Sequence, residues 1–286
     1  MKIDFHCHIF TKTNSKENFF QQFDKFSGYG FYERIKEQLN HVQSKNIENL
    51  LHRTLYCVKK ANLDKVVLLP VNMKENQQVI EWSKAAPDVF IPFFNPPERL
   101  NPNLNVKKVL ETQLRENNIR GFKIMISFRS RSLNDRILYP TFEIAAKNQL
   151  PIVMHTGYPP PGTKTNVLTY ADPLKIEEIL PSFPKLIIII AHMGFPWVDV
   201  ALALAVQYPM IYLDISNLIY MMPNRLKEFI IHAKELIGID KLLFGSDGFI
   251  PEMIEMTVNM FEDVSYLSKE EIEKIMGWNA ERILFK

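Results

Sequence analysis

The chain has 286 residues, of which 47% are hydrophobic and 23% are charged, a composition that suits a globular protein with a large core. Its 34 basic and 32 acidic residues give a net charge of +2, and the absence of a dense basic patch argues against a nucleic-acid surface. Two cysteines cannot build a disulfide framework and fit a reducing compartment. The sequence has no signal-peptide core and no apolar run of the roughly 20 residues that a membrane helix needs, so we expect a cytoplasmic protein.

Eight short runs that favour β-strands follow one another along the chain. They are residues 2–8, 65–70, 89–94, 121–126, 151–155, 186–192, 210–215 and 241–247. Most are continuously apolar, as is typical of parallel strands buried on both faces. Helical patterns separate them at residues 46–60, 76–86, 106–117, 139–148, 173–180, 198–207 and 223–236. This alternation predicts an α/β fold, a single (β/α)8 TIM barrel that spans residues 1–286.

The interval between the first two strands is long and rich in aromatic residues. Segment 11–45 contains a series of Phe and Tyr side chains with two glycines among them. The segment is either a helical insertion packed on the barrel or a lid over its mouth. Because the loops that follow the strands build the active face of such barrels, we predict a lid.

Two histidines lie in the first strand, in the run IDFHCH. Successive side chains of a strand point to opposite faces, so His6 and His8 share one face and Cys7 points to the other. A pair of imidazoles on one face can bind a single metal ion. A short motif of this kind is also found as a buried structural pair, and the rest of the chain must decide between the two interpretations.

Three more polar residues stand at the ends of predicted strands. His155 ends the fifth strand, His192 the sixth and Asp247 the eighth. The carboxyl ends of the strands of a barrel gather at one mouth, so these residues should converge with the histidines of the first strand. Neutral imidazoles and a carboxylate are a ligand set for a first-row divalent metal. The pattern therefore favours a metal site.

The sequence resembles the amidohydrolase superfamily, in particular its amidohydrolase-related (type 2) branch. The resemblance covers nearly the whole chain. It is carried by five motifs in order, DFHCH, GFKIM, LPIVMHTG, FPKLIIIIAHMG and LLFGSDG, and by segment 268–284, which resembles the C-terminal helix of that branch. It implies a metal-dependent hydrolase, in a family that also contains decarboxylases, hydratases and lactonases.

The resemblance also implies roles for the residues at the mouth. The positions of His6, His8, His155 and Asp247 would bind one divalent ion, most often zinc or manganese, and His192 would lie beside the bound water and the substrate. An aspartate in that place can act both as a ligand and as a proton acceptor. A histidine beside the metal can polarise a carbonyl or donate a proton to the leaving group.

Lys123 lies within the fourth predicted strand, where a lysine is costly unless it is paired or modified. In binuclear relatives a carbamylated lysine on this strand bridges two metals, and His155 and His192 would then bind the second ion. The other interpretations are a substrate-binding ammonium group and a structural ion pair. Relatives often carry a histidine two residues after this lysine, where this chain has Met125.

Two further residues are candidates for substrate binding. Arg129, in the loop after the fourth strand, is either a solvated charge or a clamp for an acidic substrate. Trp197, after the sixth strand, either stacks on a planar substrate or fills the core.

Together these residues predict a hydrolase that uses one zinc or manganese ion per chain. The expected reaction cleaves an amide, ester or lactone bond in a small carboxylated molecule. The alternative is a metal-dependent decarboxylase, a lyase acting on an unsaturated or aromatic carboxylic acid at the same site. We expect a small-molecule substrate and neither nucleic acid nor membrane as a partner, and a homodimer is left open.

Overall fold

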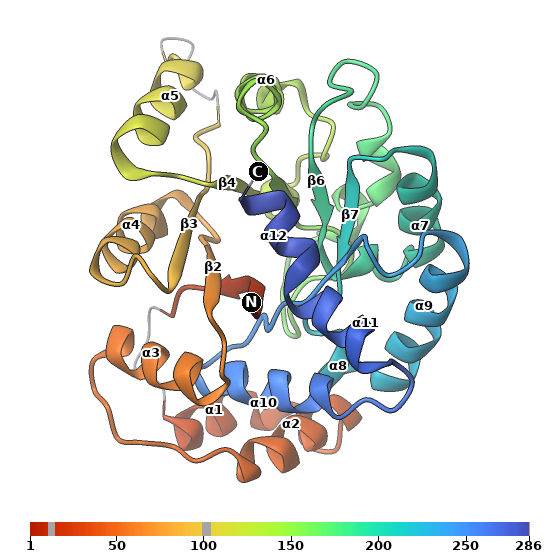
Figure 1. Ribbon diagram of the computed structural model, residues 1–286. Coiled ribbons are helices and arrows are strands. Elements are labelled where there is room, and N and C mark those ends of the chain that lie inside the picture. The colour runs from red at the N-terminus through yellow and green to blue at the C-terminus, as the bar shows by residue number, and fades with distance from the viewer. Residues whose placement is uncertain (11–14, 99–103, 286) are drawn as a thin grey trace.

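A parallel sheet of eight strands, paired in the order β1 to β8, forms the centre of the protein (Figure 1). The structure is a computed structural model and describes residues 1–10, 15–98 and 104–285. Backbone hydrogen bonds from Phe5 N to Phe244 O (2.9 Å) and from Asp247 N to His6 O (2.8 Å) join the last strand to the first. The chain is therefore a TIM barrel, as predicted. Its strands are Ile3–His8 (β1), Lys65–Leu69 (β2), Phe90–Phe94 (β3), Gly121–Ile124 (β4), Ile152–Met154 (β5), Ile188–Ile190 (β6), Ile211–Asp214 (β7) and Leu242–Leu243 (β8).

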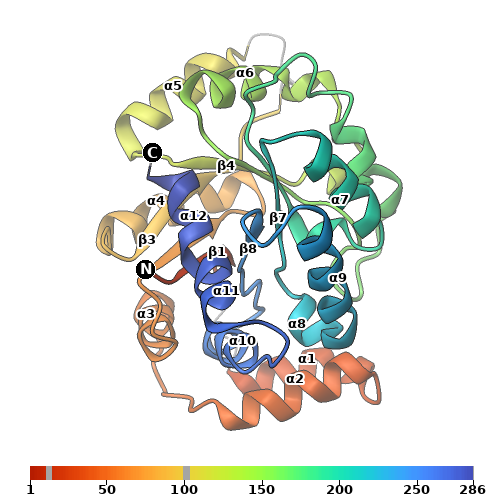
Figure 2. The same cartoon turned by 45° about the vertical axis from the view of Figure 1, so that its right-hand side comes forward.

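The α-helices surround the barrel (Figures 1 and 2). They are Lys16–Phe23 (α1), Gly30–His41 (α2), Leu50–Lys60 (α3), Asn76–Ala85 (α4), Val106–Asn117 (α5), Tyr139–Asn148 (α6), Val198–Gln207 (α7), Leu218–Met221 (α8), Pro223–Leu236 (α9), Glu252–Glu262 (α10), Lys269–Glu273 (α11) and Asn279–Leu284 (α12). A π-helical turn, Lys274–Trp278, joins α11 to α12. Within the described residues, no helix is both long and apolar enough to cross a membrane.

One predicted helix is wrong. Residues 173–180 form only a 3-10 helix, Pro173–Ile176, followed by turns. Pro181 explains the difference, because a proline disfavours the helical conformation of the residue before it and so blocks an α-helix through this short segment.

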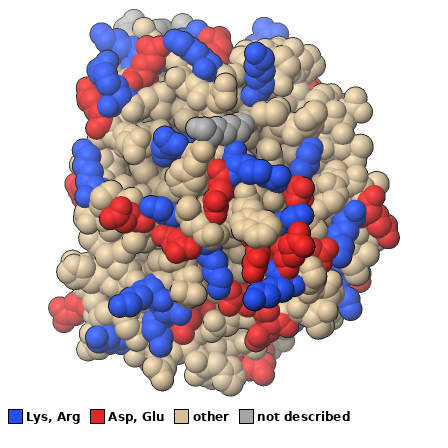
Figure 3. Space-filling model, viewed as in Figure 1, with Lys and Arg blue, Asp and Glu red and all other residues tan. Residues whose placement is uncertain are grey.

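The interior of the barrel is filled by apolar side chains from the strands. Phe5, Phe93 and Val153 belong to this interior cluster, together with residues of the other strands. The helix α12 adds Ala280, Ile283 and Leu284 to the same cluster and lies across one end of the barrel (Figures 1 and 2). Basic and acidic side chains are interspersed over this face (Figure 3).

A β-bulge in β1 sets the direction of the side chains at the mouth. Asp4 pairs with Val66 and Cys7 with Leu68, so three steps along β1 match two steps along β2. The extra residue breaks the strict alternation of faces. Phe5 therefore fills the barrel interior while Cys7 packs outside against the helices. The predicted separation of Cys7 from the two histidines is confirmed.

The segment between β1 and β2 packs against the C-terminal half of the barrel. The Phe19 ring of α1 stacks on Phe249, with 5.9 Å between the ring centroids, and Phe23 lies 5.0 Å from the same ring. Figure 1 shows α1 and α2 beside α10. Residues 11–14 of the predicted lid lie outside the described residues, and closure of the segment over the mouth stays a prediction.

Gly245 provides the space for His6, and we expect Gly245→Ala to destabilise the protein. A Cβ at Gly245 would lie 2.4 Å from the Cβ of His6 and 2.9 Å from that of Ser216. Overpacking a buried site of this kind costs about 1–3 kcal/mol of unfolding free energy. Gly30→Ala is the matched control, since a Cβ at Gly30 meets nothing within 4 Å. Denaturant unfolding of both variants checks the expectation, and equal stability would contradict it.

Candidate metal centre

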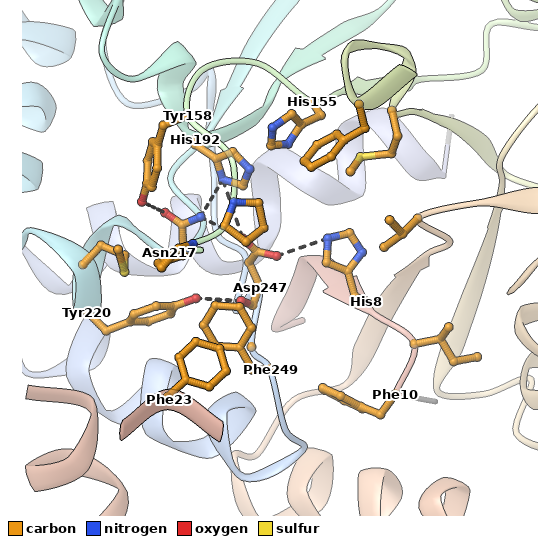
Figure 4. Close-up of a pocket in the computed structure, with 18 residues that line it drawn as sticks. His8, Phe10, Phe23, His155, Tyr158, His192, Asn217, Tyr220, Asp247 and Phe249 are labelled. Atoms are coloured by element: carbon orange, nitrogen blue, oxygen red, sulfur yellow. Dashed lines mark hydrogen bonds and ion pairs between the residues drawn. The ribbon is translucent and has the colours of Figure 1, made fainter. Parts of the chain in front are cut away.

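The five polar residues predicted at the mouth come together in the structure, and Figure 4 shows four of them, His8, His155, His192 and Asp247. Ligand atoms of His6, His192 and Asp247 lie within 4.8 Å of one another. His8 Nε2 lies 3.2 Å from Asp247 Oδ1. The His155 ring is 5.3 Å from the His192 ring, centroid to centroid. The sequence thus identified the cluster, whereas the division into ligands and a residue beside the metal stays a prediction.

The two histidines of β1 are held by acceptors on their Nδ1 atoms. His8 Nδ1 is 2.8 Å from the carbonyl oxygen of Leu69, which can only accept a hydrogen bond, so the ring proton is on Nδ1. His6 Nδ1 is 2.8 Å from Asp214 Oδ2, a carboxylate that is buried with it. In both rings Nε2 is therefore left with a lone pair. A carboxylate or a carbonyl behind the histidine is the usual support of a metal ligand.

The charges at the site also suit a cation. Burial lowers the pKa of His6 to about 4, and burial likewise lowers the pKa values of His155 and His192, so these rings are neutral. Burial alone would raise the pKa of Asp247, but the neighbouring imidazoles of His6 and His8 hold it well below its ordinary value. Neutral imidazoles and an anionic carboxylate are suitable ligands for a cation, and the Lys123 ammonium, 3.0 Å from His6 Nε2, is the positive group now beside them.

One donor in this cluster lacks a partner. Among the described residues, His155 Nε2 is buried and has no hydrogen-bond partner. Leaving a buried polar atom unpaired costs roughly 1–3 kcal/mol, so a ligand at this position would recover free energy. The residues present therefore fit a divalent metal, for which His6, His8, His155 and Asp247 remain the predicted ligands, with His192 beside them.

The comparison with known families agrees with this donor set. The family model Amidohydro_2, described as amidohydrolase, matches residues 3–286. The chain belongs to the amidohydrolase family. It is an enzyme of that family, and the resemblance found in its five motifs is confirmed.

Solved structures share the fold of this amidohydrolase over nearly the whole chain. An uncharacterized TIM-barrel protein from Bordetella bronchiseptica has a TM-score of 0.72 and 23% identity, covering 99% of this chain and 98% of the other. The 5-carboxyvanillate decarboxylase of Novosphingobium aromaticivorans, solved with manganese and 4-hydroxy-3-methoxy-5-nitrobenzoic acid, has a TM-score of 0.66 and 14% identity, covering 99% and 96%. At such identities the likeness shows the fold.

A curated relative matches a part of the amidohydrolase. Protein fluG of Emericella nidulans is 27% identical over 140 residues, which are 46% of this chain. The match spans only 16% of the length of that protein.

A second group of polar residues, which the sequence analysis missed, supports the cluster. Asn217 Nδ2 donates to Asp247 Oδ2 (2.8 Å) and lies 3.1 Å from His192 Nδ1. Tyr158 OH donates to Asn217 Oδ1 (3.1 Å), and Tyr220 OH donates to the Asp247 carbonyl oxygen (2.6 Å). These residues fix the direction of Asp247 (Figure 4).

Asp214 was also missed, although the sequence contained a signal for it. It is a charged residue at the end of an apolar strand, the pattern that identified Asp247. Besides holding His6, its Oδ1 accepts hydrogen bonds from Ser216 Oγ and from the backbone N of His192 (3.0 Å). Burial would raise the pKa of Asp214, but the imidazole of His6 keeps it below its ordinary value.

Lys123 lies beneath the cluster. Its Nζ is fully buried and 3.0 Å from His6 Nε2, and burial lowers its pKa to about 8. None of the close ion pairs among the described residues includes this lysine, but the charges of Asp214 and Asp247 act to raise its pKa, so the structural ion pair stays a prediction. Carbamylation and substrate binding stay predictions, and the described lining of the nearby cavity does not contain Lys123.

The two other predicted substrate contacts lie away from the cluster. Arg129 forms an ion pair with Glu98, and Trp197 is half-buried at the start of α7. Neither belongs to the described lining of the cavity at the metal centre. Their roles in substrate binding stay predictions.

We expect Asp214→Asn to weaken metal binding without unfolding the amidohydrolase. The amide oxygen can still accept from His6 Nδ1, but the negative charge that strengthens the ligand is lost. Loss of such a supporting partner typically reduces metal affinity by about 10–100-fold. Competition for zinc with a coloured chelator measures the change, and Asp199→Asn on the exposed side of α7 is the control. Equal zinc affinity in both variants would exclude this role for Asp214.

Proposed function

We propose that this amidohydrolase is a zinc- or manganese-dependent hydrolase that cleaves an amide, ester or lactone bond in a small molecule, with one ion per chain. The observation that carries the proposal is the set of oriented donors at the mouth, in which His6 and His8 present Nε2 and Asp247 presents Oδ1. A cavity of about 430 Å³ adjoins these donors, which is enough for a small substrate.

A divalent ion at this centre would polarise a carbonyl and lower the pKa of water toward about 7. The chain's own residues would manage the protons. Asn217 donates to Asp247 Oδ2 and so fixes the orientation of the carboxylate, which would accept a proton from the attacking water. His192 Nδ1 is 2.9 Å from Ser216 Oγ, so its ring is fixed and Nε2 remains for the carbonyl oxygen or the leaving group.

The second candidate is a decarboxylase at the same centre. It is favoured by the solved 5-carboxyvanillate decarboxylase, which shares the fold over 99% of this chain and was solved with manganese. In that reaction the centre would hold the substrate carboxylate. Asp247 or His192 would take up a proton from water and deliver it to the ring carbon, whose bond to the carboxyl carbon breaks as CO2 leaves. Hydrolysis instead yields a new carboxylic acid, so the products separate the two candidates.

Two further expectations belong to the proposal. A cytoplasmic location is supported by the low cysteine count and by Cys7 and Cys57, which are buried free thiols. A small-molecule partner is supported by the size of the cavity.

The proposed reaction can be tested on a panel of phenyl acetate, a γ-lactone, an acetanilide and a series of benzoic acids. We expect acid formation from the first three and no CO2 from the benzoic acids. Chelation should abolish turnover, and one equivalent of zinc or manganese should restore it. CO2 release as the main product would favour the decarboxylase, and no metal or two ions at full occupancy would contradict the single-ion centre.

Asp247→Asn and His192→Asn distinguish a ligand from a residue beside the metal. Asp247→Asn removes the proton acceptor, so we expect kcat to fall by about 10²–10⁴ with part of the metal retained. His192→Asn should keep nearly normal metal content and lose turnover to a similar extent. The test is strict, because ligand atoms of His192, His6 and Asp247 lie within 4.8 Å of one another, close enough to share one ion. Metal loss in step with activity in His192→Asn would make it a ligand.

A further inference from the structure

Polar and apolar residues are segregated in the cavity at the metal centre. The polar side chains of His8, His155, His192, Asn217 and Asp247 form one part of its lining. Most of the remaining lining is aromatic or aliphatic and includes Phe10, Phe23, Met125, Phe128, Pro161 and Phe249. Figure 4 shows Phe23 and Phe249 side by side and Phe10 apart from them, all on the side away from His155. A bound molecule that reaches the metal centre therefore meets the rings of Phe23 and Phe249 at its far end, while Phe128 lies beside His155.

Phe23 and Phe249 form a preassembled wall. Their ring centroids are 5.0 Å apart, although one ring comes from α1 and the other from the loop before α10. Phe19 is buried and stacks on Phe249 from behind at 5.9 Å. At another place in the lining, Phe128 lies 4.9 Å from the His155 ring. Rings supported in this way offer a fixed surface for another flat group.

The charges of the cavity exclude a second acidic group on its ligand. Asp247 carries the one formal charge among the described lining residues, and no lysine or arginine is among them. Two candidate cations have other partners: the Lys123 ammonium contacts His6, and Arg129 forms an ion pair with Glu98. The Lys25 ammonium lies over the Phe26 ring, 5.1 Å from its centroid, and Lys25 is not in the lining. A substrate carboxylate placed among these phenylalanines would lose its hydration without gaining a cationic partner, which is energetically unfavourable.

We propose that the substrate carries an uncharged aromatic or similarly flat apolar group, which packs against Phe10, Phe23 and Phe249 while its reacting group lies at the metal centre. This inference rests on the proposed function in one respect only, namely that the reacting group of the substrate lies at the metal centre. It replaces the acidic clamp predicted at Arg129 by an apolar wall. It applies equally to hydrolysis and to decarboxylation, because in both the part of the substrate away from the metal meets the same wall.

Binding of hydroxamic acids to the zinc-loaded protein tests the inference. A hydroxamate chelates zinc through two oxygens, so benzohydroxamic acid places a neutral ring in the cavity. Its 3-carboxy and 4-carboxy derivatives place a charge on the same ring in two directions. Titration calorimetry should show the neutral compound binding more tightly than both derivatives by about tenfold or more, the effect of an unpaired charge moved from water to an apolar wall.

Two substitutions of Phe249 sharpen the test. Phe249→Lys adds a cation to the wall and should bring a carboxylated probe to within about threefold of the neutral one. Phe249→Leu is the control, because it keeps the wall apolar and should keep the preference. Lys25→Ala should leave the preference unchanged, since this ammonium is outside the lining.

Each outcome has a defined meaning. A carboxylated probe that binds the unmodified protein as tightly as the neutral one, or failure of the neutral probe to bind protein that holds zinc, overturns the substrate class. The substrate class is also overturned if the unmodified protein prefers the carboxylated probes and Lys25→Ala loses this preference. In that case Lys25 recognises the charge. The expected order of affinities combined with no hydrolysis of the panel leaves the substrate class in place and refutes the proposed hydrolase.

Discussion

One extra residue in β1 decides how the mouth of the barrel is built. The interior needs Phe5 near the middle of the strand, and the mouth needs His6 and His8 at its end. A regular strand cannot supply both, because strict alternation turns Phe5 and His6 to opposite faces. The bulge between Asp4 and Cys7 turns His6 inward after Phe5 has entered the core. Asp4 fixes this irregularity, since its Oδ1 accepts from the backbone N of His6 (3.1 Å) and of Ser246 (2.9 Å).

Below the mouth, several groups that prefer water are buried together. Lys123, Asp214 and His6 are all fully buried, and each would be costly alone. Their burial costs less because they contact one another. His6 Nδ1 donates to Asp214, and His6 Nε2 lies 3.0 Å from the Lys123 ammonium. The low dielectric that makes isolated charges unfavourable also strengthens these pairings. The compensation is incomplete at His155 Nε2, and also at Asp4 Oδ2 and Ser246 Oγ, which are buried without a hydrogen-bond partner within the described part of the chain.

The sequence predicted those features that depend on local pattern. Apolar spacing and polar flanking residues predicted both ends of four helices correctly. These helices are 106–117, 139–148, 198–207 and 223–236. Residues at strand ends were found because one rule of barrel geometry places them at the mouth. Asn217 and Tyr158 were not found, since each is a single polar residue in a loop and becomes meaningful only when tertiary packing brings it to Asp247. The helix α10 was missed as well, although it carries an apolar face.

The position of α12 has a consequence for the order of events during synthesis. This helix supplies Ala280, Ile283 and Leu284 to the interior of the barrel. Strands β1 to β7 leave the ribosome long before these residues do, and domains fold as units while the chain emerges. Until residue 284 is outside the exit tunnel, the open end of the interior cluster would be accessible to chaperones. Because α12 belongs to the same interior cluster as the strands, the barrel and its metal-binding mouth would complete their folding only after this last helix has emerged.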